Sequence, residues 1–236
     1  WYNQNSVRRW KHCALEQMER RKKHMRAWIA RMTEDNIDQS AIEKAGEILK
    51  NGGLAAFPTE TVYGLGGNAL DAKASEKIYA AKGRPSDNPL IVHIGRMEDL
   101  ETVAANVPES ARKLAAACWP GPLTIVFEAA GCVSPLLTAK TGKIGIRLSG
   151  HDGARQIALA AGKPLTATSA NLSGLPECAT ADEVIAQLGD RLDAVVDLGN
   201  TSGTAGSTII DTTTEQPVIL RAGVISREEI LQKTGI

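Results

Sequence analysis

The spacing of apolar positions alternates between a helical and a strand period over residues 37–236. Apolar residues recur every three or four positions over 37–49, and Gly52-Gly53 follows, which predicts a helix that ends there. Residues 54–57 form a short apolar run before Pro58, which predicts a buried strand. The same patterns predict helices at 72–81, 109–118, 154–161, 184–188 and 227–233, and strands at 89–94, 123–127, 143–148, 165–168, 194–196, 207–211 and 218–221.

Strands and helices therefore alternate along this part of the chain. Such alternation favours a layered α/β domain with a mixed sheet. The chain shows no internal repeat and no low-complexity linker after residue 33, so we expect one catalytic domain over 33–236.

Residues 1–32 differ from the rest in charge. They hold nine basic and two acidic residues, so a segment of +7 precedes a body of −7 in a chain of zero formal charge. Apolar positions from Val7 to Met32 are spaced for one face of a basic helix. We expect an extension, helical or disordered, outside the catalytic domain. Three interpretations stay open: little function, an arm that contacts tRNA or a membrane surface, and an organellar transit peptide.

Composition excludes several classes of protein. Hydrophobic residues make up 43% and charged residues 23%, which is ordinary for a globular protein. Four scattered cysteines without a Cys-x-x-Cys pair argue against structural zinc or a disulfide framework. No apolar run approaches the roughly 18 residues of a membrane span. We expect a cytoplasmic protein.

Polar groups gather where predicted strands end, which is where α/β sheets usually bind ligands. The stretch 58–66 is rich in threonine and glycine, and it suits either a ligand loop or an ordinary turn. Stretch 168–174 is ambiguous in the same way.

Charged residues add sharper candidates. Lys82 and Arg84 bracket a glycine and could hold a triphosphate, although cations also favour a helix C-terminus. Arg147 lies inside an alternating strand and Arg221 ends another, so each faces solvent or meets an anion. His93 lies in an apolar strand, where a lone histidine is more often a core residue than a catalyst.

Familiar catalytic motifs are missing. The sequence has no phosphate loop of the Gly-x-x-x-x-Gly-Lys type and no Gly-x-Gly-x-x-Gly fingerprint. The four histidines are not at metal-ligand spacing, so we expect no metal site built by the protein and no covalent catalysis.

Eight motifs occur in an order that resembles the YrdC-type threonylcarbamoyl-AMP synthases, over about 170 residues. They are Pro-Thr-Glu-Thr-Val-Tyr-Gly-Leu-Gly at 58–66, Lys-Gly-Arg-Pro at 82–85, Asn-Pro-Leu at 88–90, Pro-Gly-Pro-Leu-Thr at 120–124, Gly-Ile-Arg at 145–147, Ser-Ala-Asn-x-Ser-Gly at 169–174, Ser-Thr-Ile-Ile-Asp at 207–211 and Leu-Arg-x-Gly at 220–223. The resemblance implies a single YrdC-like α/β domain, with a twisted mixed sheet flanked by helices around a concave basic pocket.

The resemblance also implies an activity. Enzymes of this family are nucleotidyltransferases that join L-threonine, bicarbonate and ATP into L-threonylcarbamoyladenylate and release pyrophosphate. The product serves the N6-threonylcarbamoyladenosine (t6A) modification of tRNA, through a tRNA threonylcarbamoyltransferase complex. Mg²⁺ is expected to arrive with ATP. Direct contact with tRNA or double-stranded RNA stays open.

Site residues follow from the same resemblance. Lys82 and Arg84 are expected to be catalytic. The expected ATP-binding residues are Lys82, Arg84, Asn88, Lys143, Ser169, Asn171 and Arg221. The expected threonine-binding residues are Thr61, His93, Arg147 and Ser207, with Arg147 on the carboxylate.

Two alternatives remain. A carbamoyl-adenylate-forming domain is one, although such proteins carry zinc-finger cysteine pairs that this sequence lacks. An RNA-binding YrdC-like module is the other, and the −7 charge of the body argues against broad electrostatic RNA binding.

Overall fold

A computed structural model describes residues 27–203 and 206–236. Its strands are β1 Trp28–Arg31, β2 Ala55–Pro58, β3 Tyr63–Asn68, β4 Ile91–Ile94, β5 Ala104–Asn106, β6 Leu123–Ala129, β7 Lys143–Leu148, β8 Leu165–Ser169, β9 Ala194–Asp197, β10 Thr208–Asp211 and β11 Val218–Arg221. Its helices are α2 Gln39–Lys50, α3 Ala72–Lys82, α4 Leu100–Val103, α5 Glu109–Cys118, α6 Asp152–Ala161, α7 Ala181–Leu188 and α8 Arg227–Thr234, with a 3₁₀ turn at Met97–Asp99.

All the strands join one mixed sheet. Its order is β1-β9-β2-β3-β8-β4-β7-β6-β10-β11, and β5 pairs with β6. The pairs β1–β9, β2–β9, β4–β7 and β6–β10 are parallel, whereas the remaining pairs are antiparallel. The predicted α/β domain with a mixed sheet is therefore confirmed.

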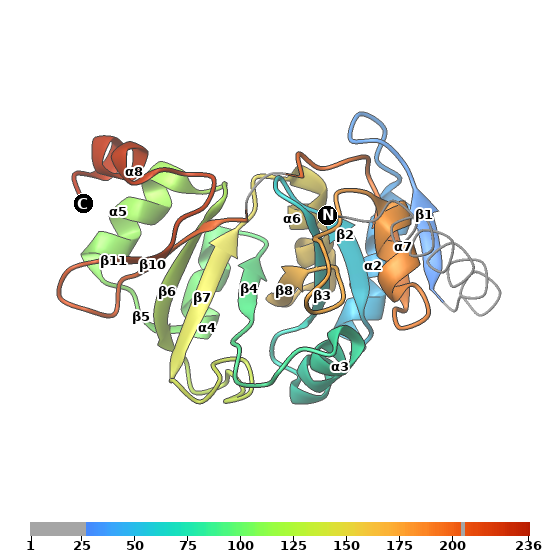
Figure 1. Ribbon diagram of the computed structural model, residues 1–236, viewed down its shortest axis with the longest axis horizontal. Coiled ribbons are helices and arrows are strands. Elements are labelled where there is room, and N and C mark those ends of the chain that lie inside the picture. The colour runs from blue at the N-terminus through green and yellow to red at the C-terminus, as the bar shows by residue number, and fades with distance from the viewer. Residues whose placement is uncertain (1–26, 204–205) are drawn as a thin grey trace, which may run out of the picture.

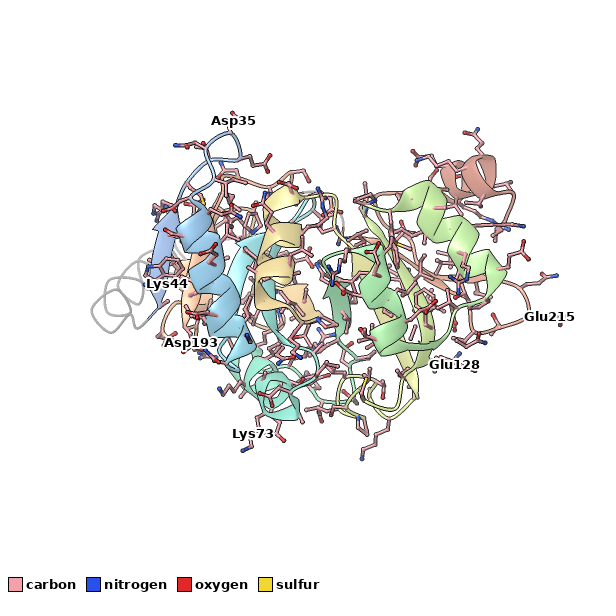
Figure 2. The ribbon with its side chains drawn as sticks, turned by 180° about the vertical axis from the view of Figure 1, so that it is seen from behind. Asp35, Lys44, Lys73, Glu128, Asp193 and Glu215 are labelled. Carbon is pink, nitrogen blue, oxygen red and sulfur yellow. The ribbon has the colours of Figure 1, made fainter. Side chains whose placement is uncertain are left out.

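Helices cover the sheet at both ends (Figure 1). At one end α2 and α6 lie side by side, as the view from behind shows, and at the other end α5 packs on β6 and α8 (Figure 2). The cluster beneath α2 and α6 is made of buried Ala, Ile, Leu and Val together with Phe57. Aliphatic side chains thus form most of this core, as the scarcity of aromatics requires.

Residue 46 allows α2 and α6 to approach closely. A Cβ added at Gly46 would lie 2.6 Å from the Ala160 carbonyl carbon, closer than real Cβ atoms come to backbone. The helix pair therefore depends on the missing side chain, because the two backbones meet at this point.

Three of the observed strands, β1, β3 and β5, were not expected from the sequence. The stretch 58–66, which contains the first half of β3, was expected to be a ligand loop or an ordinary turn; Gly64, Gly66 and Gly67 lower the strand propensity of β3. A Cβ at Gly66 would lie 2.6 Å from the Phe57 ring, so the glycines leave space for that buried ring between paired strands.

The predicted domain boundary at residue 32 is wrong. Trp28–Arg31 forms β1, which pairs in parallel with β9 at the edge of the sheet, rather than continuing a helix outside the domain. Arg31 forms ion pairs with Asp197 at 2.7 Å and Asp182 at 2.6 Å, and the Lys44 ammonium lies 4.4 Å from the Trp28 ring. The sheet thus begins inside the basic segment. The rest of the expected helix, from Val7 to Met25, lies outside the described residues.

Across residues 27–203 and 206–236, every helix is too short or too polar to cross a membrane.

Candidate active site

A cavity of about 170 Å³ opens where β4, β7 and β8 meet the turn between β2 and β3. Ligand pockets are commonly about 300–1,000 Å³, so a nucleotide would extend beyond this volume. Seven of the expected site residues line the cavity: Thr61, Arg84, His93, Arg147, Ser169, Ser207 and Arg221. The structure thus brings together residues that are up to 160 positions apart in the sequence.

His93 and Arg147 are neighbours on adjacent strands. They are paired in the parallel register of β4 and β7, so their side chains stand next to each other on one face of the sheet. His93 is buried, and its Nδ1 has no hydrogen-bond partner among the described residues. Burial and then the Arg147 charge lower the pKa of His93, against an opposing effect of Glu60. The imidazole is therefore neutral near pH 7 and can donate or accept one hydrogen bond toward a ligand.

Arg147 is 5% exposed and has a fixed counter-ion. Its Nη2 lies 2.7 Å from Oε1 of Glu60, which makes an ion pair, although the atoms are outside hydrogen-bond alignment. Nε of Arg147 has no acceptor within the described part of the chain. This guanidinium can therefore still donate hydrogen bonds to a ligand.

Two residues that follow β7 hold the Glu60 carboxylate through hydrogen bonds. The backbone nitrogen of Gly150 donates to its Oε1 at 2.8 Å, and the Ser149 hydroxyl donates to its Oε2 at 2.5 Å. Burial raises the pKa of the Glu60 carboxyl, but the Arg147 charge and these hydrogen bonds outweigh burial and hold that pKa well below its usual range. Glu60 is thus ionised at neutral pH.

Arg84 and Arg221 donate hydrogen bonds to neutral groups among the described residues. Arg84 donates to the carbonyls of Asn88 at 3.3 Å and Pro89 at 3.0 Å. Arg221 donates to the Ser207 carbonyl at 2.7 Å and the Ser207 hydroxyl at 3.2 Å. The charge of Glu177, which lines the same cavity, also acts on Arg221, although at a longer range than an ion pair. Because neither arginine forms an ion pair with a described carboxylate, both can still bind an anionic ligand.

Hydroxyl groups complete the lining. Oγ1 of Thr61 lies 3.0 Å from Oγ1 of Thr59, which donates to the Val62 carbonyl at 2.7 Å. Ser207 lies 2.7 Å from Thr124 through their hydroxyl oxygens. These buried groups are already hydrogen-bonded, so they are fixed in place before a ligand arrives.

Lys82 and Asn171 lie behind the cavity wall instead of lining it. The Lys82 ammonium donates to the carbonyl of Ser169, to the carbonyl of Asn171 at 2.8 Å and to Oδ1 of Asn171 at 3.2 Å. The Asn171 amide in turn donates to the carbonyls of Leu172 and Leu175. Burial and the nearby Arg84 lower the pKa of Lys82 to about 8. Both side chains therefore hold the loop that carries Ser169.

The remaining two expected residues are placed elsewhere. Lys143 begins β7, four residues before Arg147, and its ammonium pairs with Asp211 at 2.9 Å outside the cavity. The Asn88 residue is exposed and contributes its carbonyl, which accepts from Arg84 and from the Tyr79 hydroxyl at 3.0 Å. The structure therefore separates Lys143 from the other expected ATP-binding residues.

Three further residues were not among the expected ones. Thr59 and Glu177 line the cavity, and Glu60 pairs with Arg147 behind them. Thr59 and Glu60 stand within the motif at 58–66, so their place beside Thr61 was a signal that sequence reasoning could have used. Glu177 lies in an irregular exposed segment and carries no such signal.

Comparison with known proteins gives consistent matches. The family model Sua5_yciO_yrdC, described as telomere recombination, matches residues 47–223, a range that contains every residue lining the cavity. The threonylcarbamoyl-AMP synthase of Pyrococcus abyssi (strain GE5 / Orsay) is 41% identical over 201 residues, which cover 85% of this chain and 59% of the relative. That of Bacillus subtilis (strain 168) is 40% identical over 205 residues, covering 86% and 59%.

A solved structure shows the same fold. P. abyssi Sua5 complexed with L-threonine superposes with a TM-score of 0.86 at 40% identity, covering 89% of this chain and 61% of that chain. The chain thus spans about 59% of the length of these two curated relatives.

Proposed function

The chain belongs to the Sua5/YciO/YrdC family, and from this premise we propose that it forms L-threonylcarbamoyladenylate and pyrophosphate from L-threonine, bicarbonate and ATP. The names of the relatives support a nucleotidyltransferase of this kind, and the P. abyssi complex supports L-threonine as the amino acid. Bicarbonate and ATP follow from the chemistry of the named product.

The proposal rests on one observation: two groups of residues with different charge line a single cavity. Arg84 and Arg221 form no ion pair with a described carboxylate, which suits the phosphates of a nucleotide. Arg147, neutral His93 and the Thr61 hydroxyl lie in the same cavity and suit the carboxylate and hydroxyl of threonine. We therefore assign ATP to the first group and threonine to the second.

The proposed reaction has two steps. The amino nitrogen of threonine bonds to the carbon of bicarbonate, and water leaves, which gives an N-carboxylate. An oxygen of this carboxylate attacks the α-phosphorus of ATP as the bond to the bridging oxygen breaks, and pyrophosphate leaves. The protein positions the reactants and stabilises the charge that develops on pyrophosphate, and no residue becomes covalently attached.

Mg²⁺ is proposed to enter with ATP. Among the described residues lining the cavity, Glu177 is the carboxylate, and Ser169 and Ser207 offer hydroxyl oxygens. Oxygen donors of this kind fit a magnesium ion that is held mainly by phosphates and water. The ion would supply positive charge on the phosphates, and Arg84 and Arg221 would add to it from the protein.

The product and its destination are part of the proposal. A threonylcarbamoyl-adenylate is a mixed anhydride, so it must be consumed by an acceptor. We propose a tRNA threonylcarbamoyltransferase complex that makes t6A, in the cytoplasm.

A pyrophosphate-release assay tests the activity. Release should require ATP, L-threonine and bicarbonate together, and omission of any one should abolish it. Equal release without threonine would overturn the proposal. Release with carbamoyl phosphate in place of threonine and bicarbonate would favour a carbamoyl-adenylate-forming domain, and RNA binding that is indifferent to ATP, without turnover, would favour an RNA-binding module.

Two variants test the division of the cavity. Arg84→Met should raise the KM for ATP, and Arg147→Met should raise the KM for threonine. In each case the lost charge-assisted contact should cost about 1.5–3 kcal/mol of binding free energy. Arg96→Met and Arg112→Met are matched controls, since these exposed arginines pair with Asp99 and Glu101 away from the cavity. The opposite pattern of KM changes would show that the two ligands were assigned to the wrong ends.

A further inference from the structure

The arginines in the cavity differ in one respect. Arg147 has a carboxylate 2.7 Å away, whereas Arg84 and Arg221 donate to carbonyl and hydroxyl oxygens only, as far as the described residues go. Arg84 and Arg221 together exceed the single charge of Glu177 in the cavity lining, so their end of the cavity carries net positive charge, whereas Glu60 compensates the charge of Arg147.

The counter-ion at Arg147 is built into the protein. Besides the ion pair, Glu60 accepts hydrogen bonds from Ser149 and Gly150, which follow β7. Its backbone carbonyl accepts from the Ser202 hydroxyl at 3.1 Å. Because its backbone and both carboxylate oxygens are held, Glu60 cannot turn away when a ligand approaches Arg147.

A fixed ion pair selects ligands by their net charge. A polyanion gains attraction from Arg147 but meets repulsion of similar size from Glu60 a few ångströms away. A zwitterionic amino acid has no net charge and can still accept hydrogen bonds from the guanidinium through its carboxylate. Discrimination against the wrong ligand is thus achieved by a repulsive group.

We propose that Glu60 is a specificity-determining residue that excludes phosphate groups from Arg147 and so reserves that end of the cavity for a zwitterionic α-amino acid. The amino acid rests on the proposed function, whereas the exclusion of phosphate does not. Without Glu60, all three guanidiniums would attract the triphosphate and the pyrophosphate product. Glu60 thus directs two differently charged substrates to separate ends of one cavity.

Isothermal titration with inorganic pyrophosphate tests this role on the full chain. The wild type should bind one pyrophosphate, with a Kd that saturating L-threonine leaves unchanged. Glu60→Gln keeps the size of the side chain and an acceptor oxygen for Gly150 but removes the charge. This variant should bind a second pyrophosphate, and L-threonine should compete with it and raise its apparent Kd by about tenfold.

Two further variants separate charge from structure. Glu60→Gln combined with Arg147→Met should lose the second pyrophosphate site. Ser149→Ala removes a donor to Glu60 without changing the charge, and it should keep the stoichiometry of one. A second site in Ser149→Ala would mean that loosening the wall, rather than losing the charge, opens Arg147 to phosphate, and the proposal would be overturned.

The remaining outcomes also test the proposed role of Glu60. A stoichiometry of one in folded Glu60→Gln overturns the proposal. If Glu60→Gln does not fold, the wild type decides, because competition between L-threonine and pyrophosphate there would show that Glu60 does not exclude phosphate. A wild type that binds no L-threonine would instead overturn the proposed function, and the pyrophosphate stoichiometries would still decide the role of Glu60.

Discussion

The Lys82 side chain contacts the end of β8 and the residues that follow it. Its ammonium is buried and donates to carbonyl and amide oxygens of Ser169 and Asn171, and the opposing effect of the Glu177 charge is smaller than that of burial. This explains why burial is the first cause of its lowered pKa. The catalytic role expected for Lys82 stays a prediction. The observed contacts indicate instead that Lys82 positions Ser169 and Asn171.

The first prediction concerns stability at alkaline pH. The pKa of Lys82 is about 8 in the folded protein against 10.5 for an ordinary lysine, so between these values the unfolded chain binds more protons. The free energy of unfolding should gain up to about 1.4 kcal/mol per pH unit from this group as pH rises through the window. Urea unfolding at several pH values should show this increment in the wild type and its loss in Lys82→Met. Parallel curves for the two proteins would show that Lys82 keeps an ordinary pKa.

The second prediction concerns Lys143, which the sequence placed with ATP. Since its ammonium pairs with Asp211 and it lies outside the cavity, Lys143→Met should leave the KM for ATP unchanged. Loss of this half-exposed pair should cost under about 1 kcal/mol of stability. A rise in the KM for ATP as large as that of Arg84→Met would return Lys143 to the nucleotide site.

These residues show how far the site could be predicted. Arg147 and Arg221 stood out because a charge in a strand needs a partner, and both line the cavity. Lys143 lies on the same face of β7 as Arg147, because strand side chains alternate, but alternation does not tell which end of a strand reaches a cavity. Nor can a motif tell whether a lysine donates to a ligand or to a neighbouring loop, because the donor groups are the same.

At the scale of elements, the close contact of α2 and α6 gives the third prediction. Gly46→Ala should lower the free energy of unfolding by about 1–3 kcal/mol, because the new methyl group meets the backbone at Ala160 and forces the helices apart. Thermal unfolding measures the change. Gly131→Ala is the matched control, since a Cβ there has nothing within 4 Å. Equal melting temperatures in the two variants would show that the helix pair can move to make room.

Element type was predictable where a segment is long and periodic, and not elsewhere. The predicted bounds of α5, β7 and β11 match those observed. β3 was not predicted, because its glycines are typical of a loop in the sequence, whereas in the structure they leave space for the Phe57 ring. β1 was missed because its apolar residues also fit a helical period, and only the free edge of β9 decides for a strand. Long-range pairing therefore overrode the local pattern.

At the scale of the whole molecule, β1 changes the expectation for truncation. Residues 1–32 were expected to lie outside the catalytic domain, but deletion of residues 1–31 would remove a strand, the ion pairs of Arg31 and the Trp28 side chain. The fourth prediction is that this deletion lowers the melting temperature by roughly 4–8 °C, for about 2 kcal/mol in a protein of this size.

Deletion of residues 1–26 serves as the comparison, because it keeps β1 whole. The difference in melting temperature between the two truncated proteins isolates the contribution of the strand. If both melt together, β1 adds nothing to the stability of the sheet, and a boundary near residue 32 would be adequate after all.

The order of the strands also limits how the molecule can deform. Asp197 ends β9 and Thr208 begins β10 eleven residues later, yet seven steps separate these strands in the sheet. A flat sheet would place them roughly 33–34 Å apart at 4.7–4.9 Å per step, whereas eleven residues reach at most roughly 36–40 Å when fully extended.

The described part of the connection, residues 198–203, is not fully extended, since Gly199 and Gly203 turn it with φ of +103° and +62° and the backbone nitrogen of Gly203 donates to the Thr61 carbonyl. The length of the chain between β9 and β10 therefore limits how far these two strands can separate when the sheet deforms.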